Sequence, residues 1–407
     1  MKEIIKIAWR NIWRNKLRSS VVIVSIILGI WSGLFIMAMT YGLNEQRIDG
    51  AITTTLSHGQ IHNPKFLSDQ TINDTIIDRL TVIAIINSIE QVKAFSERII
   101  STGMVANAKG TFGTQLTGID PKKEKKITEI YNHLIEGTYF TKIKRNPAVI
   151  GKKLADKMKI KINSKIVVTL QNSVGDLVNA AFRVEGIFKT QNTTFDGSTI
   201  FVRKDDLAKI VDFKNGEINE IAFVGNSLDQ ASIIAEKLKL TDKNNKTETW
   251  DEISPELGYA QEMMSTFLII FMLIVLAALS FGIINSMLMA VLERKKELGM
   301  LMAVGMRKKK VFAMITFETV FLTMLAAPLG LLLSYLSIEY YSTHGIDLSM
   351  FSSGLESLGI GAIMYTYLPG NMYINVTLLT LLVAFISSLF PARRALKLNP
   401  AEAIKSL

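Results

Sequence analysis

Four long apolar segments constrain the fold of this 407-residue chain more than any other feature. A bilayer core about 30 Å thick is crossed by roughly 20 apolar residues in a helix, which also pairs its own backbone groups. The segments carry almost no charge, and the third contains only Glu318. The first is far longer than the core of a signal peptide, about 7–15 residues, so we expect an uncleaved anchor. Membrane-spanning helices are therefore predicted at 20–42, 263–292, 311–338 and 372–390.

Lysine and arginine gather in three short segments, at 1–19, 293–310 and 391–407. The segment 339–371 contains neither residue, and residues 43–262 are nearly balanced, with 29 basic and 28 acidic side chains. Because positive charge marks the cytoplasmic side of a membrane protein, we predict that both termini and the 293–310 loop are cytoplasmic. The net charge of +10 then reflects topology, and it gives no support for a nucleic-acid partner.

Residues 43–262 are expected to form a mixed α+β extracytoplasmic domain, inserted between the first and second of the four transmembrane helices. Apolar residues recur at helical spacing in two segments and follow strand-like patterns in several shorter ones. The Lys-rich stretch 122–126 is interpreted as a solvated turn. Helices are predicted near 76–90 and 228–239, and strands at 97–106, 111–118, 165–171, 180–188, 198–202 and 217–224.

No pattern of residues indicates catalysis or a bound cofactor. The chain has no cysteine, which excludes disulfides and thiolate metal sites. His58 and His62 are four residues apart, but Gly59 and Pro64 favour an extended segment, which would hold the two rings about 13 Å apart. The phosphate-binding pattern G-x-x-x-x-G-K-[ST] is missing, so ATP is not expected to bind here. We predict a non-catalytic chain without a metal site.

The N-terminal segment 1–19 has the pattern of an amphipathic helix on the membrane surface. Basic residues recur every fourth position, and tryptophans and isoleucines occupy another face. Tryptophan prefers headgroup depth, and basic side chains lie near anionic lipid. Charge that merely sets the topology would explain the basic residues but not the tryptophans. The residues predicted at the interface are Trp9, Arg10, Trp13, Arg14 and Arg18.

The cytoplasmic segment 293–305 reads ERKKELGMLMAVG. Glu293 and Glu297 lie one helical turn apart, as do Leu298 and Met302. A short helix with one acidic and one apolar face suits docking into a groove on another protein. A polar hairpin that only joins two spans would show the same spacing, so the pattern alone leaves both interpretations open.

Two polar residues fall inside the predicted spans. Asn285 either bonds across helices or faces a polar gap. Glu318 is costly inside a membrane. It either pairs with the neighbouring basic loop or reaches the surface as an exposed carboxylate.

Several segments together resemble the FtsX-like, or MacB-like, ABC transporter permease superfamily. The segment 293–305 matches its cytoplasmic signature E-R-x-x-E-[LI]-G-x-L-x-A-x-G. The two ends of the chain are similar to the same superfamily, and the inserted region is similar to its periplasmic core domain. These further segments are 8–17 (AWRNIWRNKL), 133–140 (HLIEGTYF), 148–155 (AVIGKKLA), 249–255 (TWDEISP), 391–395 (PARRA) and 400–404 (PAEAI).

This resemblance implies a mechanotransmission ABC transporter in the cytoplasmic (inner) membrane. Two permease chains, identical or homologous, would pair with two copies of a separate ATPase that binds ATP and Mg²⁺. The segment 293–305 would be the coupling helix seated in that ATPase. The residues expected to make this contact are Glu293, Arg294, Glu297, Leu298, Gly299, Leu301, Ala303 and Gly305.

Length and domain content narrow the type within the superfamily. The chain lacks the fused ATPase of the MacB type and exceeds the division-type members, so it most resembles the lipoprotein-releasing LolC/LolE type. A lipoprotein would be extracted from the outer leaflet, with access between the first two spans near Phe35, Met39 and Met264. The loop with which LolC captures a periplasmic carrier is not recognisable. Peptide or drug efflux with an envelope adaptor, and regulation of an envelope enzyme, are the alternatives.

Overall fold

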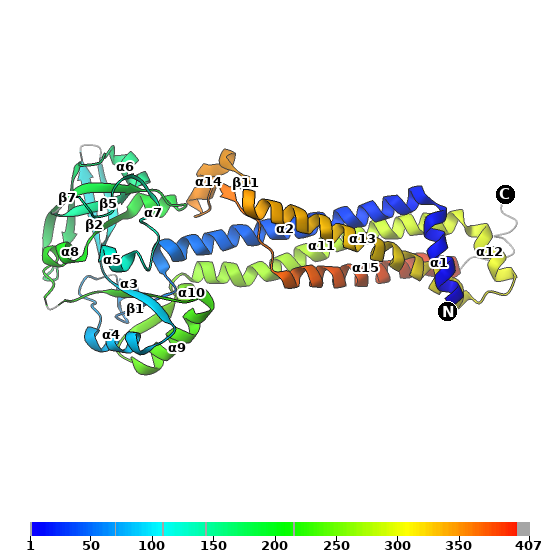
Figure 1. The fold of residues 1–407 in the computed structure, drawn as a ribbon, viewed down its shortest axis with the longest axis horizontal. Coiled ribbons are helices and arrows are strands. Elements are labelled where there is room, and N and C mark those ends of the chain that lie inside the picture. The colour runs from blue at the N-terminus through cyan, green and yellow to red at the C-terminus, as the bar shows by residue number, and fades with distance from the viewer. Residues whose placement is uncertain (1, 70, 108–109, 143–144, 215, 397–407) are drawn as a thin grey trace. The chain divides into compact units, whose positions relative to one another are not determined.

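The structure, a computed structural model, describes residues 2–69, 71–107, 110–142, 145–214 and 216–396 (Figure 1). The chain divides into two compact units. One, here called the helical unit, comprises residues 1–43, 262–346 and 364–407. The other, called the mixed domain, comprises residues 44–261 and 347–363.

Long apolar helices form the helical unit. Within the described residues, four helices are long and apolar enough to cross a membrane: α2, α11, α13 and α15. Each extends past the apolar segment predicted for it, because polar residues continue the helix beyond the uncharged stretch. The bounds are α1 (Lys2–Arg14), α2 (Lys16–Ala51), α11 (Pro255–Glu293), α12 (Lys295–Ala303), α13 (Lys308–His344) and α15 (Gly370–Leu396).

Small residues let these helices approach closely. A Cβ added to Gly29 of α2 would lie 2.2 Å from Leu279 of α11. On another face of α2, the backbone of Ile27 would lie 3.3 Å from a Cβ added to Gly330 of α13. The hydroxyls of Ser280 and Ser387 link α11 to α15 at 2.7 Å. Close contact between helices of this kind replaces the hydrophobic driving force that a lipid environment does not provide.

The fourth apolar helix does not end at Pro391, directly after the predicted span 372–390. The helix α15 continues through it to Leu396. A proline inside a helix removes one backbone hydrogen bond, but Pro391, Ala392 and Ala395 are buried in the helical unit, and this packing holds the last turns. The rest of the predicted cytoplasmic segment 391–407 lies outside the described residues.

The mixed domain is built on one strand network. Strand β2 is long enough to take part in two sheets: it pairs with β9 through its first half and with β3 and β6 through its second. The strand order is β10-β1-β9-β2-β3-β8-β5-β7-β4, with β6 between β2 and β7. The bounds are β1 (Gly59–His62), β2 (Val92–Asn107), β3 (Gly110–Ile119), β4 (Leu134–Gly137), β5 (Pro147–Gly151), β6 (Lys165–Gln171), β7 (Leu177–Phe188), β8 (Thr199–Arg203), β9 (Glu220–Gly225) and β10 (Lys246–Thr249).

Six of the described strands close into a ring, because β6 pairs with both β2 and β7. Around the ring the order is β2-β3-β8-β5-β7-β6, an arrangement that removes exposed edges. The strands β10, β1 and β9 extend from the first half of β2 as an open sheet. Buried side chains of the ring strands include Val105, Leu116, Ile150, Val168 and Phe182.

Short helices complete the mixed domain. Helices α4 and α9 contact each other, and α9 also packs on β9 and β10 of the open sheet. The bounds are η1 (Ile52–Leu56), α3 (Phe66–Asp69), α4 (Arg79–Ser88), α5 (Pro121–Glu124), α6 (Lys152–Met158), α7 (Thr193–Ser198), α8 (Lys204–Ile210), η2 (Leu228–Gln230), α9 (Ala231–Thr241), α10 (Trp250–Ile253), η3 (Ser349–Phe351) and α14 (Ser352–Ser357). Two short strands, β11 (Ile346–Asp347) and β12 (Ile363–Met364), pair with each other.

Candidate functional site: the coupling segment and the Arg98 network

The segment 293–305 forms a helix that is set off from its neighbours by a break at each end. Arg294 has φ −94° and ψ 14°, so it interrupts the helical path between α11 and α12. At the other end, Gly305 has φ +100°, a conformation that favours glycine. The sequence predicted a short helix here, and α12 occupies most of the segment.

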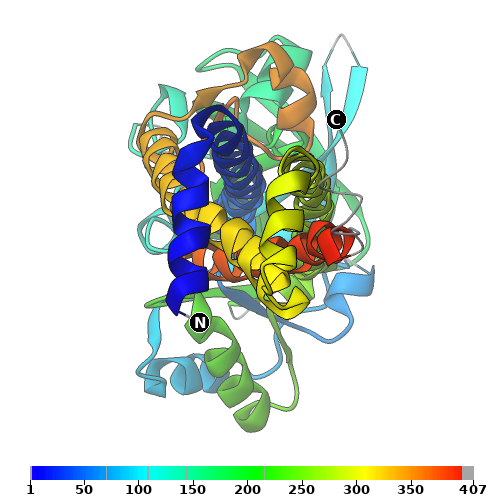
Figure 2. The same ribbon diagram turned by 90° about the vertical axis from the view of Figure 1, so that its right-hand side faces the viewer.

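Helices α1 and α12 lie at the same end of the helical unit (Figure 2), and charged and polar side chains surround the first of these breaks. The Arg294 guanidinium donates from Nη1 to both carboxylate oxygens of Glu318, at 3.1 Å each. Its Nη2 donates to the backbone carbonyl of Asn11 in α1, at 3.2 Å. Arg294 is 9% exposed and Glu318 is 6% exposed. The partner of Glu318 therefore comes from the basic loop, one of the two possibilities that the sequence left open.

Two further ion pairs join the same elements. Arg14 at the end of α1 lies 2.5 Å from Glu297 of α12, and Arg18 at the start of α2 pairs with Glu293. Exposed pairs of this kind contribute about 0.2–1 kcal/mol each. Removing one partner of a buried pair such as Arg294–Glu318 costs about 3–5 kcal/mol. The residues of this Arg294 cluster are Asn11, Arg14, Arg18, Glu293, Arg294, Glu297 and Glu318.

The residues predicted to contact an ATPase divide by exposure. Leu298 and Gly299 are buried in the helical unit, so they support α12 from within. Leu301 is half-buried, whereas Ala303 and Gly305 are exposed. The most exposed apolar side chains of the segment are Met300, at 59%, and Val304, at 85%, and the sequence analysis singled out neither.

Within the segment 1–19, predicted as one interfacial helix, residues Lys2–Arg14 form the helix α1, and Arg18 lies in α2. Ile4, Ala8 and Ile12 form the buried face of α1, and the helix packs on α13. Trp9 and Trp13 are exposed. The two rings contact each other edge to face, with centroids 6.1 Å apart. Arg10 is exposed as well.

The remaining predicted residues of the helical unit lie on α2 and α11. Phe35 stacks on Trp31 with the ring centroids 5.8 Å apart. Met39 and Met264 are half-buried, and Met264 packs with Phe35 against the helical core. Asn285 is exposed on α11.

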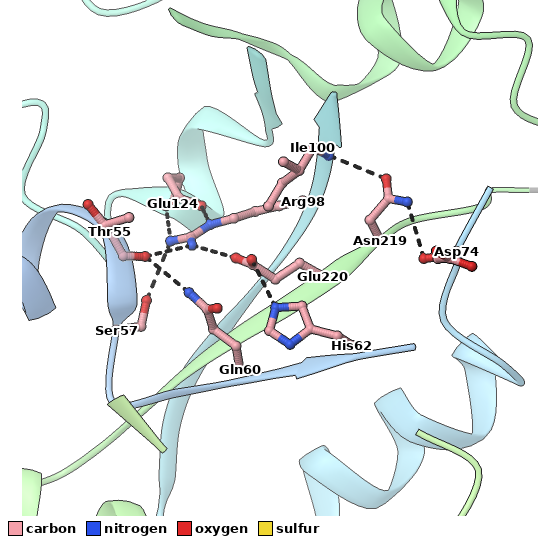
Figure 3. A network of polar contacts seen from close by, with 10 residues as sticks. All are labelled: Thr55, Ser57, Gln60, His62, Asp74, Arg98, Ile100, Glu124, Asn219 and Glu220. Atoms are coloured by element: carbon pink, nitrogen blue, oxygen red, sulfur yellow. Dashed lines mark hydrogen bonds and ion pairs between the residues drawn. The ribbon is translucent and has the colours of Figure 1, made fainter. Parts of the chain in front are cut away.

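In the mixed domain, one buried arginine connects the end of α2 to the sheet (Figure 3). Arg98 on β2 donates to Glu124 at 2.6 and 3.3 Å and to Glu220 at 2.7 Å. It also donates to the carbonyl of Thr55 at 3.1 Å and to the hydroxyl of Ser57 at 3.4 Å. These contacts use all five N–H groups of the guanidinium. The chain that leaves the first long helix is thus fastened directly to β2.

The sequence analysis missed this Arg98 network, and the interpretation of 122–126 as a solvated turn is wrong at its centre. Glu124 in α5 is completely buried, because its carboxylate faces Arg98. Lys122 and Lys123 do face the solvent. The available signal was the pair Glu97-Arg98 inside a predicted apolar strand, since a charge on a buried strand requires a partner.

In the Arg98 network, ion pairing favours the charged forms of Arg98 and Glu220, the two members whose pKa shifts. Burial alone would lower the pKa of Arg98, but Glu124 and Glu220 raise it above its ordinary value. Burial alone would raise the pKa of Glu220, but Arg98 and His62 lower it below the usual range. His62 lies 3.2 Å from Glu220 through Nε2. It ends strand β1, so the extended conformation predicted for this segment is confirmed.

Ser57 marks the point where the helical path ends. It follows the π-helical turn η1, and its backbone angles are φ 59° and ψ −165°. Residues other than glycine rarely adopt this backbone conformation. The amide of Ser57 donates to the carbonyl of Ile52 at 2.9 Å. Gln60 donates to the Thr55 carbonyl that also receives Arg98. Backbone strain and a dense polar network therefore coincide at this joint.

Residues 347–363 belong to the mixed domain although they are distant in sequence. Lys189 pairs with Glu356 at 3.3 Å, and Thr193 donates to the Glu356 carbonyl at 3.3 Å. Nearby, Asp196 accepts hydrogen bonds from Thr190 between 2.7 and 3.2 Å. Burial raises the pKa of Asp196 to about 6 despite these bonds.

Two family descriptions cover nearly all of the chain. Residues 19–239 match the MacB-like periplasmic core domain, which is more than half of the chain. Residues 269–400 match the FtsX-like permease C-terminal family. The chain belongs to the family with a MacB-like periplasmic core domain. The resemblance inferred from the sequence is confirmed, and α12 with its Arg294 cluster lies inside the second matched region.

Individual relatives share little sequence identity with the chain, but they match it over most of its length. The chain is 25% identical to the ABC transporter permease YtrF of Bacillus subtilis over 78% of its own length and 73% of that protein. It is 22% identical to the lipoprotein-releasing system transmembrane protein LolC of Neisseria meningitidis, over 96% and 95% of the two chains. It is 25% identical to the pyoverdine export ATP-binding/permease protein PvdT of Pseudomonas fluorescens, over 99% of this chain and 59% of that one.

We predict that Glu124→Gln destabilises the mixed domain by about 3 kcal/mol, because it leaves the buried Arg98 only partly neutralised. For a domain of this size the thermal midpoint should fall by about 6–12 °C. The measurement is thermal unfolding of the full-length protein in detergent. The control is Glu129→Gln, which changes an exposed glutamate five residues away. Equal midpoints for the two variants would contradict the network's role.

A second prediction concerns pH. The folded-state pKa of Asp196 is about 6, above the ordinary value of about 3.9, so the folded state holds this proton more tightly. The resulting stability is fully present below about pH 4 and is lost as the pH rises to about 6. Asp196→Asn should therefore gain stability relative to wild type, by roughly 2 kcal/mol, between pH 4 and pH 7. Unfolding midpoints across this range, with exposed Asp176→Asn as the control, measure the effect; parallel curves would refute it.

Proposed function

We propose that this chain is the permease subunit of a mechanotransmission-type ABC transporter. It couples ATP hydrolysis by a separate ATPase to the extraction of lipoproteins from the outer leaflet of the inner membrane. The observation that carries the proposal is α12, which lies in the region matching the FtsX-like family. It presents the exposed apolar side chains Met300 and Val304 beside a run of basic residues, 307–310. Such a surface fits a groove with an apolar floor and acidic edges.

The proposed topology has the four long helices crossing the membrane, both termini in the cytoplasm and the mixed domain outside. Its main support is the distribution of lysine and arginine. The aromatic residues agree with it, because tryptophan and tyrosine favour the two membrane surfaces. Trp9 and Trp13 are exposed at the end of the helical unit that carries α12, and Tyr335 and Tyr340 are exposed toward the other end of α13.

Movement would reach the mixed domain through α2 and α11, the helices that adjoin it in sequence. Helix α2 leads into η1 and β1, which the Arg98 network fastens to the sheet. Strand β10 leads through α10 into α11 and pairs with β1. Asn44 and Gln261 form a hydrogen bond between the two helices just below these strands. A displacement of either helix would therefore be delivered to one sheet.

We propose that a second permease chain, identical or homologous, packs against α11. Only 22% of the most apolar part of α11 is buried within the chain, compared with 39% for α2 and α13. Asn285 is exposed on this helix. An amide inside a membrane favours a partner across a helix interface, which a second copy would provide.

The assignment of lipoproteins as substrate rests on the relatives. LolC of Neisseria meningitidis matches over almost the whole length of both chains. Phe35 and Met264 each pack against the core of the helical unit, and with Met39 they line the proposed access route from the outer leaflet. A periplasmic carrier would then receive the substrate. Export of a small molecule or peptide is the second candidate, supported by the match to PvdT, which is named for pyoverdine export.

We predict that Val304→Glu weakens association with the ATPase at least tenfold. The side chain is 85% exposed, so the change should leave the fold intact and alter only what docks there. The measurement is the amount of ATPase that co-purifies with the full-length permease, together with its rate of ATP hydrolysis. Val174→Glu is the matched control, since Val174 is 72% exposed in the mixed domain. Unchanged association for both variants would refute docking on this face.

The substrate is tested by photo-crosslinking. A photoreactive residue at position 35, 39 or 264 should form adducts with acylated proteins in membranes, because these positions line the proposed access route. The adducts are identified by mass spectrometry, with position 104 of the mixed domain, an exposed methionine, as the control. Recovery of small amphiphiles or peptides without any lipoprotein would favour the export alternative.

A further inference from the structure

We infer that Glu293, Arg294 and Glu297 are positioning residues that fasten the junction of α11 and α12 to α1, to α13 and to the start of α2, and that they do not contact the ATPase. The inference rests on the proposed function, which places the ATPase at α12. It changes the expectation that the charges of the E-R-x-x-E pattern form the docking face. Docking is left to the exposed apolar side chains Met300 and Val304, which come after these charges in the same segment.

Each charged residue of the E-R-x-x-E pattern already forms an ion pair within the chain. Glu293 pairs with Arg18, and Glu297 pairs with Arg14. Arg294 pairs with Glu318. An ATPase that used these charges would first have to displace three ion pairs.

The groups on the other side of these contacts come from α1 and the start of α2. Asn11 and Arg14 are three residues apart in α1, on neighbouring turns of one helical face. Asn11 contributes its carbonyl to Arg294 and its amide to Glu318, and Arg14 pairs with Glu297. Arg18 lies in the first turn of α2, beyond the break at residue 15, and pairs with Glu293. Ile4, Ala8 and Ile12 anchor the buried face of α1.

Arg294 also stiffens the junction of α11 and α12. It occupies the break between α11 and α12, where the two helices would otherwise be free to bend. Its Nη1 donates to both carboxylate oxygens of Glu318 in α13, and its Nη2 donates to the carbonyl of Asn11 in α1. Because the two nitrogens belong to one planar group, contacts to two different elements fix its orientation as well as its distance. A force on α12 is therefore passed to α1 and α13 and does not simply bend the chain at residue 294.

The test is a charge-swap cycle in the full-length permease, purified with the ATPase that accompanies it. Arg14→Glu and Glu297→Arg should each lower the ATP hydrolysis rate about threefold or more while ATPase association stays at the wild-type level. The double variant, which restores an ion pair of reversed polarity, should recover to within about twofold of wild type. If Glu297→Arg abolishes association and the swap does not restore it, Glu297 contacts the ATPase and the inference is wrong.

Cross-linking gives an independent measurement that needs no ATPase. The chain has no cysteine, so Arg14→Cys and Glu297→Cys would introduce its only thiols. A short bismaleimide should join this pair in high yield, and the joined protein should keep its ATP hydrolysis rate. The matched control is Arg14→Cys with Lys296→Cys, because Lys296 is exposed on a different side of α12. Equal yields for the two pairs would refute the contact, as would a tenfold loss of hydrolysis on joining the first pair.

Different results would refute the proposed docking of the ATPase and the proposed positioning role of the three charged residues. If no ATPase accompanies the wild-type permease, or Val304→Glu leaves its association unchanged, the proposed docking is wrong. The cross-linking yields then still decide whether α12 is fastened to α1. If docking at Val304 holds but the charge swap does not restore activity, the positioning role is wrong while the proposed function stands.

Discussion

A buried guanidinium is tolerated only where carboxylates and carbonyls meet its N–H groups, and this constraint governs both junctions of the protein. Arg98 satisfies it in the mixed domain with two glutamates and the end of the first long helix. Arg294 satisfies it in the helical unit with Glu318 and the backbone of α1. In each case the arginine joins at least three elements that are remote in sequence. Loss of either would separate elements that hydrophobic packing alone does not align.

The elements that the sequence predicts well are those whose signal is local. The four apolar helices follow from the lack of charge over some twenty residues, and strand β6 follows from its own composition with identical bounds. The partners of Arg98 are not local: Glu124 is 26 residues away and Glu220 is 122 residues away. No periodicity in the sequence marks such pairs. The sequence therefore predicts that the Lys-rich turn 122–126 is wholly exposed, although Glu124 within it is buried.

The segment 293–305 shows the same limit over a shorter stretch of chain. Spacing predicts the helix α12 and its two faces, but it does not say which face is covered. That depends on α1 and the start of α2, which precede it by some 280 residues and supply Arg14 and Arg18. The acidic face is therefore occupied within the chain, and Leu298 points into the helical core. Functional residues inferred from a motif alone were thus divided between an internal contact and an exposed surface.

The pairing of β1 with β10 has a mechanical consequence. Gly59, where the path from α2 enters the sheet, is the direct partner of Thr249, where the path to α11 leaves it. Spreading the two helices apart would load this first pair of residues and peel the strands one hydrogen bond at a time. Sliding one helix along the other would load all bonds of the pair together. The base of the mixed domain should accordingly yield to separation and resist shear, so it transmits a lengthwise stroke more faithfully than a sideways one.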